Sequence, residues 1–353
     1  MSLMLIDEKV KTLLVIGNGF DIAHGLKTGY TDFLDDLNKK IGTLWLSDKN
    51  LNMNSFRNFK RRIQFALNKD DKFLYPAIDA YTRSNFGNIW VAYFNEIREN
   101  ENNRVGNNWL DFEREIEDVI QKIEKLILGT IRDVDKSSLS KIMCGYLGKT
   151  NRQIIDEYIP KLNFDLEVLT LLLERYLISE QKKLVVKPLP IIKKISNVSA
   201  VISYNYTDTW KKIYGNERDV KTIFIHGELT KHNLVLGINE TLDKKSADEF
   251  TVCAGFKKFF QRVKFKLGND YRKIIPAKNK SNLQAVVYGH SLAANDRESL
   301  RWLFKNSTAS KIIVYYFDEE SHHQQIANTI QIIGKDKLIE DVNGGRIIFQ
   351  PIE

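Results

Sequence analysis

The chain has 353 residues, of which 43% are hydrophobic and 11% aromatic, and it carries a formal net charge of +8. That length and composition can bury a sizeable core, as one large domain or two smaller ones. The sequence has no apolar run of about 18 residues, so no membrane span or membrane partner is expected. Two cysteines, Cys144 and Cys253, are too few for a four-thiolate zinc site and favour a reduced, cytoplasmic protein.

The first predicted element is a buried strand that ends in an abrupt turn. Residues 13–16 are apolar and lead directly into the sequence GNGFD, after which the pattern becomes helical. Glycines at such a turn let backbone N–H groups approach a phosphate at the start of a helix. The candidate nucleotide-binding residues here are Gly17, Asn18, Gly19 and Asp21. Because a dinucleotide fingerprint has a third glycine, a tight turn capped by Asp21 is the alternative interpretation.

The region from about residue 41 to residue 195 is predicted to be mostly helical. Apolar residues recur three and four positions apart in "FRNFKRRIQFAL", "NIWVAYFNEIREN", "WLDFEREIEDVIQKIEKLILGTI" and "FDLEVLTLLLERYLISEQKKL". Short apolar runs return after residue 197, and each ends in turn residues. They are "VSAVISYN", "KTIFIHGEL", "NLVLGINE", "LQAVVYGHS", "SKIIVYYFDEE" and "GRIIFQPI".

Helices are predicted after several of these strands, at residues 208–214, 296–304 and 321–333. Strands that alternate with helices indicate an α/β fold with a mostly parallel, Rossmann-like sheet. We therefore expect a discontinuous nucleotide-binding domain made of residues 1–45 and 195–353. A helical insertion domain, residues 46–194, would interrupt it.

Ligands of open parallel sheets bind at the carboxyl ends of the strands, so the residues that follow each strand are candidates. His226 directly follows "TIFI" and precedes a glycine, so a neutral imidazole there could accept a proton from a ribose hydroxyl. Asn205 and Asp208 follow "AVISY", and the Asn205 amide could orient a water or a ribose. The alternatives are a histidine bonded to a loop carbonyl and an Asx turn that caps the following helix.

The sequence "GHSLA" places Gly289, His290 and Ser291 after another strand. One interpretation is a serine hydrolase with Ser291 as the nucleophile, but Ala293 stands where the second glycine of a nucleophile elbow is needed. A phosphate-binding or capping serine is the favoured interpretation. His24, His322 and His323 lack metal-ligand spacing with carboxylates, so we expect no metal site.

Basic residues are concentrated in residues 256–280, where aromatic residues are interleaved with them. A nucleic-acid groove is one interpretation. The favoured alternative is a single helix whose inner face is apolar and whose basic residues face solvent. The predicted inner face consists of Phe256, Phe259, Phe260, Val263 and Leu267.

Taken together, several of these stretches resemble the AbiH family of bacterial abortive-infection proteins. They are "VIGNGFDIAHGLKTGYTDFL", "NWLDFE", "SYNYTDTW", "IFIHGEL", "LVLGINE" and "YGHSLAANDRESLRWLF", in that order. The resemblance spans nearly the whole chain and is most specific at its start. It implies a role in defence against phage, through death or dormancy of the infected cell.

The order of the motifs also resembles, more distantly, the sirtuin-like NAD-binding fold. That resemblance implies that Gly17, Gly19, Asp21, Asn205, Asp208, Gly289, His290 and Ser291 surround a nucleotide, and that His226 falls on the catalytic histidine. Asn18 departs from the alanine of that pattern, and two cysteines cannot form the deacetylases' zinc ribbon. The resemblance therefore implies NAD hydrolysis at the N-glycosidic bond, and not lysine deacylation.

In this hypothesis His226 orients or deprotonates a ribose hydroxyl, Asn205 positions the attacking water, and Gly17 and Gly19 hold the pyrophosphate. Three other functions stay open. They are a non-catalytic nucleotide or nucleic-acid sensor, a hydrolase that uses Ser291, and a module that binds a phage-derived trigger protein. The sequence is also compatible with an oligomer.

Overall fold

The computed structural model of the chain describes residues 7, 10–44, 53–84, 87–100, 109–127, 142, 150–215, 220–238, 252–267, 271–274, 283–307 and 309–352. The chain forms two compact units. The sheet unit consists of residues 1–28, 177–233 and 266–353, and the helical unit consists of residues 29–176 and 234–265. Each unit is discontinuous in sequence, because the chain passes between them more than once.

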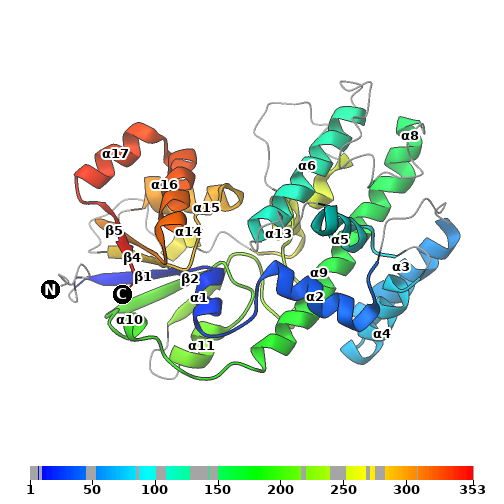
Figure 1. Ribbon diagram of the computed structural model, residues 1–353, viewed down its shortest axis with the longest axis horizontal. Helices are drawn as coiled ribbons and strands as arrows, with labels where there is room; N and C mark the ends of the chain where they lie inside the picture. The colour runs from blue at the N-terminus through cyan, green and yellow to red at the C-terminus, as the bar shows by residue number, and fades with distance from the viewer. Residues whose placement is uncertain are drawn as a thin grey trace. The chain divides into compact units, whose positions relative to one another are not determined.

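The sheet unit contains six parallel strands in the order β3-β2-β1-β4-β5-β6, which confirms the predicted α/β, Rossmann-like class (Figure 1). The strands are β1 (Lys11–Ile16), β2 (Val198–Ser203), β3 (Lys221–Phe224), β4 (Leu283–Tyr288), β5 (Lys311–Tyr316) and β6 (Ile347–Pro351). The strand order reverses direction between β1 and β4. In sheets of this order, that junction is where ligands bind.

Helices cover both faces of this sheet, as Figure 1 shows. One face carries α1 (Asn18–Ala23), α10 (Pro190–Lys193) and α11 (Thr209–Tyr214). The other carries α14 (Tyr271–Ile274), α15 (Arg297–Arg301), α16 (Glu319–Ile333) and α17 (Lys335–Asn343). A 3-10 turn at Ala294–Asp296 precedes α15, and a π-helical turn at Trp302–Asn306 follows it.

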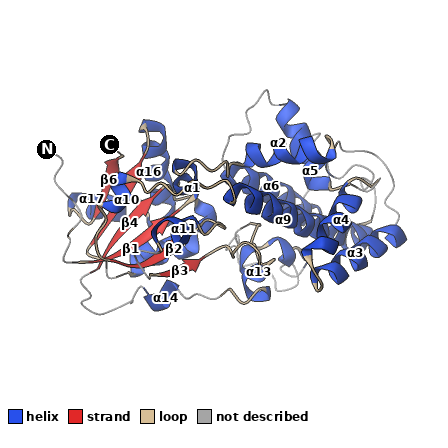
Figure 2. Ribbon diagram, turned by 90° about the horizontal axis from the view of Figure 1, so that it is seen from below, coloured by secondary structure: helices blue, strands red, loops and turns tan. Residues whose placement is uncertain are grey.

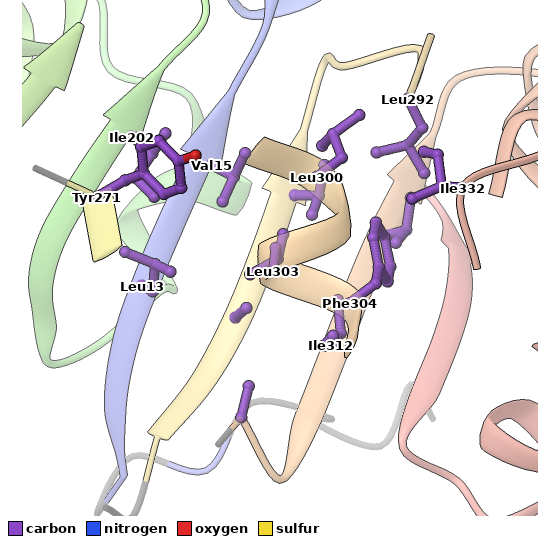
Figure 3. Close-up of a cluster of buried hydrophobic side chains, with 14 of the residues drawn as sticks. Leu13, Val15, Ile202, Tyr271, Leu292, Leu300, Leu303, Phe304, Ile312 and Ile332 are labelled. Atoms are coloured by element: carbon purple, nitrogen blue, oxygen red, sulfur yellow. The ribbon is translucent and has the colours of Figure 1, made fainter. Parts of the chain in front are cut away.

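The side chains of each strand alternate between two buried clusters. Leu13 and Val15 of β1 pack on one face with Leu300 and Phe304, as Figure 3 shows. Leu14 and Ile16 pack on the other face with helix α11 residues. Because helices cover both faces of the sheet, the strands are apolar along nearly their whole length. Apolar and polar residues therefore do not alternate clearly along these strands.

The helical unit has helices only, together with one isolated bridge, among the residues that the structure describes (Figure 2). Its helices are α2 (Tyr30–Ile41), α3 (Met53–Leu67), α4 (Asp71–Thr82), α5 (Ile89–Asn100), α6 (Trp109–Ile127), α8 (Asn151–Gln153) and α13 (Lys258–Lys264), with most of α9 (Ile159–Gln181). A π-helical turn, Ile154–Tyr158, joins α8 to α9, and a 3-10 turn, Ala254–Phe256, precedes α13. No described helix is both long and apolar enough to cross a membrane.

The strand predicted in "NLVLGINE" is wrong for the residues that the structure describes. From Leu234 to Ile238 the chain is buried in the helical unit and forms only an isolated bridge, between Ile238 and Lys257. The side chain of Gln261 takes the place of a neighbouring strand: it accepts from the Leu236 N–H at 3.0 Å and donates to the Leu236 carbonyl at 2.8 Å. The apolar run therefore indicates burial but not membership of the sheet.

Candidate functional site

The residues predicted to bind a nucleotide lie at the carboxyl ends of the strands of the sheet unit. The segment from Gly17 follows β1, Asn205 follows β2, His226 follows β3 and Gly289 follows β4. Since all strands are parallel, these four segments share one edge of the sheet. The edge includes the β1–β4 junction where the strand order reverses.

At this junction the glycines of the two turns pack directly against each other. A Cβ atom at Gly17 would lie 2.7 Å from the Gly289 carbonyl oxygen, and one at Gly19 would lie 2.8 Å from the Gly289 Cα. The N–H of Gly17 donates to Tyr288 O at 3.2 Å, and that of Gly19 donates to Gly289 O at 2.8 Å. Close packing of the two turns explains these glycines, and the predicted role of their N–H groups at a pyrophosphate has no support from this geometry.

Two histidines flank one carboxylate at the same edge, in what we name the imidazole–carboxylate cluster: His226, His290 and Asp296. The distance from His226 Nε2 to Asp296 Oδ1 is 2.8 Å, and His290 Nε2 lies 3.6 Å from Asp296 Oδ2. Because β1 and β2 lie between β3 and β4, the segment after β4 extends over their ends to bring Asp296 to His226. Both imidazoles are more than nine-tenths buried.

The hydrogen bonds of this cluster assign protons to its imidazoles. His290 Nδ1 accepts from the Leu292 N–H at 2.8 Å, so the proton of a neutral His290 is on Nε2, the nitrogen that faces Asp296. His226 likewise presents Nε2 to Asp296, which makes Nδ1 the basic nitrogen of a neutral His226. A carboxylate that holds an imidazole in one tautomer in this way leaves the other ring nitrogen able to accept a proton from a substrate.

Neighbouring residues hold this cluster in place. The Tyr204 ring packs edge-on to both imidazoles, with centroid distances of 4.2 Å to His290 and 5.8 Å to His226. The Tyr204 hydroxyl donates to Ser299 Oγ at 2.7 Å, and the Ser299 hydroxyl donates to Asp296 O at 3.1 Å. The buried Leu292 has a φ of +58°, a conformation that is uncommon for a non-glycine residue and is found most often at functional sites.

A second polar group at this edge, the Asp21 cluster, consists of Asp21, Asn205, Thr207 and Thr209. The Thr207 hydroxyl donates to Asp21 Oδ2, and the Thr209 hydroxyl donates to Thr207 Oγ1 at 3.1 Å. Burial raises the pKa of Asp21 to about 6, although hydrogen bonds from Thr207 and Thr209 and the nearby Asn205 amide lower it. A carboxyl group with a pKa near neutrality, inside a fold's ligand-binding edge, is a candidate for proton transfer.

The remaining predicted residues occupy less specific positions. Asn18 Oδ1 accepts from the Thr28 hydroxyl at 2.6 Å, and the half-buried Asp208 pairs with Lys212 at 3.4 Å. The exposed Ser291 accepts, through its carbonyl, from Asn328 Nδ2 of α16 at 2.9 Å. Among the described residues no histidine hydrogen bonds to the Ser291 hydroxyl, so the geometry does not favour the hydrolase interpretation.

The comparisons with known proteins give one match. The sequence model of the family described as "Bacteriophage abortive infection AbiH" matches residues 13–318, which is most of the chain. The chain belongs to this family. No curated protein and no solved structure matches it, so the likeness of this AbiH family member to the sirtuin-like fold rests on the sequence motifs alone.

The sequence alone assigns no role to two polar residues of this AbiH family member that the structure places in these clusters, Asp296 and Thr207. Asp296 lies close behind the Gly289–Ser291 segment, but nothing in the sequence shows that it reaches a histidine on a strand three places away in the sheet. Thr207 lies two residues after Asn205, where a hydroxyl at a strand end could have been considered. In the described part of the chain no group of three His, Cys, Asp or Glu side chains is arranged to hold a metal ion.

The basic stretch of this AbiH family member does not form the predicted amphipathic helix. Helix α13 ends at Lys264, and Phe260 and Val263 of the expected inner face are exposed. Lys257 and Lys258, by contrast, are buried and pair with Glu124 at 3.2 Å and Glu113 at 2.8 Å. The solvated-helix interpretation was therefore wrong. Lys278 and Lys280 lie outside the described residues, and nucleic-acid binding stays a prediction.

Proposed function

We infer that the chain takes part in the abortive-infection response against bacteriophage, because it belongs to the AbiH family. We propose that the protein contributes to that response by binding NAD, or a related nucleotide, at the carboxyl edge of its sheet and hydrolysing the N-glycosidic bond. The observation that carries the proposal is the His226–Asp296 pair, with its 2.8 Å contact, beside the position where strand order reverses.

In this reaction the bond between C1′ of the ribose and the nicotinamide nitrogen breaks, and its electron pair leaves with nicotinamide. The ribose develops oxocarbenium character, and water adds to C1′. His226 Nδ1 accepts a hydrogen bond or a proton from a ribose hydroxyl, while Asp296 stabilises the imidazolium that proton transfer creates. Asn205 positions the attacking water. The charge on the sugar is thereby stabilised by groups held rigidly at strand ends.

The test is NAD turnover by the purified protein and by variants of the pair. His226→Ala is expected to lower kcat about 10²- to 10⁴-fold, the usual contribution of acid–base catalysis. Asp296→Asn preserves the shape of the site but removes the charge that orients His226, and a loss of kcat is expected there too. His323→Ala, a substitution on the exposed face of α16, is the matched control and should retain full activity. Equal turnover by the wild type and His226→Ala would refute the proposal.

A further inference from the structure

Two buried polar atoms of the Asp21 cluster have no hydrogen-bond partner among the described residues: Asp21 Oδ1 and Asn205 Nδ2. The side chains are 1% and 5% exposed. A buried polar group without a partner is destabilising, so such groups persist mainly where they serve a ligand, a water or a reaction. Here an acceptor and a donor occur in the same small region of the sheet edge.

The geometry around these atoms is held by neighbouring contacts. Asp21 Oδ2 is fixed by the Thr207 hydroxyl, which leaves Oδ1 as the carboxylate's other acceptor. The backbone of Asn205 is fixed on the Ser203 hydroxyl, which accepts from the Asn205 N–H at 3.1 Å. The Asn205 amide interacts with the Asp21 carboxyl closely enough to lower its pKa, but Oδ1 and Nδ2 have no partner that meets both the distance and the angle of a normal hydrogen bond.

One small molecule that both donates and accepts would satisfy both atoms. Water does so, by donating to Asp21 Oδ1 and accepting from Asn205 Nδ2, and it is small enough for a buried polar site. A phosphate oxygen would be repelled, because Asp21 lies close to a second carboxylate, Asp208. The Asp21 cluster therefore favours water over an anionic part of the nucleotide.

We propose that Asp21 and Asn205 together hold the attacking water and that Asp21 is the base that deprotonates it. This inference rests on the proposed function, to which it adds a catalytic residue. As the water oxygen bonds to C1′ and nicotinamide leaves with the electron pair of the broken bond, Asp21 Oδ1 takes the water proton. Asp21 then releases that proton to solvent before the next turnover.

The electrostatics of Asp21 are consistent with this role. Its burial raises its pKa to about 6, which places the group near the pH at which a general base is most effective. Among the described residues, the charged side chain that affects Asp21 is Asp208. Repulsion between the two carboxylates also raises the pKa of Asp21. The uncharged neighbours Thr207, Thr209 and Asn205 oppose this effect.

The experiment compares Asp21→Asn with the wild type in two measurements, the kcat for NAD hydrolysis and the Kd of ADP-ribose. ADP-ribose is the product that forms when water replaces nicotinamide at C1′. Asp21→Asn is expected to lower kcat about a hundredfold or more and to leave the Kd within about threefold, because asparagine has nearly the same shape and still accepts a hydrogen bond but cannot take up the proton of the water. The control Asp336→Asn removes an exposed carboxylate on α17 and should change neither. Melting temperatures confirm that the variants are folded.

A second readout separates a base from a group that only shapes the site. The wild-type kcat should fall as the pH drops below about 6, where Asp21 takes up a proton. Asn205→Ala should lower kcat and move this fall in activity to higher pH, because the Asn205 side chain lowers the pKa of Asp21.

Unchanged kcat in Asp21→Asn would overturn the inference and leave the proposed function standing. A parallel loss of ADP-ribose binding, or an Asn205→Ala profile that is not shifted to higher pH, would overturn it as well. Absence of NAD turnover by the wild type would overturn the proposed function, and this inference with it.

Discussion

At Asp21, burial and hydrogen bonding act on one carboxyl group in opposite directions. Burial is the larger effect and raises the pKa from 3.8 to about 6, while the hydroxyls of Thr207 and Thr209 lower it. Asp21 is therefore a group that the fold would tolerate better when neutral. A buried carboxylate that lowers stability, at the carboxyl edge of a parallel sheet, is the pattern expected where function opposes stability.

This argument predicts a pH-dependent gain of stability in Asp21→Asn. The folded state has the higher pKa, so it binds more protons than the unfolded state between about pH 3.8 and 6, and the free energy of unfolding falls as the pH rises through that window. The shift of about two pKa units corresponds to about 3 kcal/mol in all. Relative to wild type, Asp21→Asn should therefore be more stable at pH 8 than at pH 5, by about 1 kcal/mol. Urea unfolding at both pH values measures this, and a difference that does not change with pH would contradict it.

The turns after β1 and β4 pack so closely that they require glycine at specific positions. Gly289 has a φ of +66°, and a Cβ atom there would lie 2.3 Å from the Phe20 backbone nitrogen. The same turn brings Gly17 and Gly19 against β4's end. The glycines that resemble a nucleotide fingerprint thus join two strand ends, and they position the site by their packing.

Gly289→Ala is accordingly expected to destabilise the protein by more than about 2 kcal/mol, through backbone strain and a clash with backbone atoms that cannot move aside. Gly345→Ala is the matched control: its φ is +71°, but no atom lies within 4 Å of the added Cβ. It should show only the conformational cost, about 1 kcal/mol. Denaturant unfolding of both variants measures the difference, and equal losses would show that close packing of the two turns is unimportant.

At the scale of the whole molecule, a segment distant in sequence completes the helical unit. Residues 234–265 return to it after the chain has formed β2 and β3. Two ion pairs of buried lysines hold this segment, Lys258 with the buried Glu113 and Lys257 with the partly exposed Glu124. Such pairs specify where the segment docks, since an uncompensated buried charge is strongly unfavourable.

Glu113→Gln should therefore destabilise the protein by up to about 3–5 kcal/mol, because it removes the carboxylate charge that lies 2.8 Å from the buried Lys258 ammonium. The double variant Glu113→Leu/Lys258→Met should recover most of that loss, because it removes both charges and keeps apolar volume. Thermal and urea unfolding of the wild type, Glu113→Leu, Lys258→Met and the double variant form a double-mutant cycle. A double variant as unstable as the single one would show that the ion pair is not the source of the effect.

The local pattern of the sequence determined that this is an α/β protein with helices in its middle region. Apolar runs bounded by turn residues located all six strands, and three- and four-residue spacing located the main helices, since burial of one face imposes those periods. The local sequence pattern also determined which residues follow each strand. That was enough to place Asn205 and His226 at a common edge, because parallel strands all end on the same side.

Only the tertiary structure decided what those residues contact. The pairing of His226 with Asp296 depends on the order of the strands and on the path of the segment after β4, and neither leaves a periodic signal in sequence. Lys257 and Lys258 are buried against carboxylates that lie more than a hundred residues away in the sequence. A sequence pattern reports that a side chain is apolar or charged, but long-range packing sets its partner, its solvation and therefore its pKa.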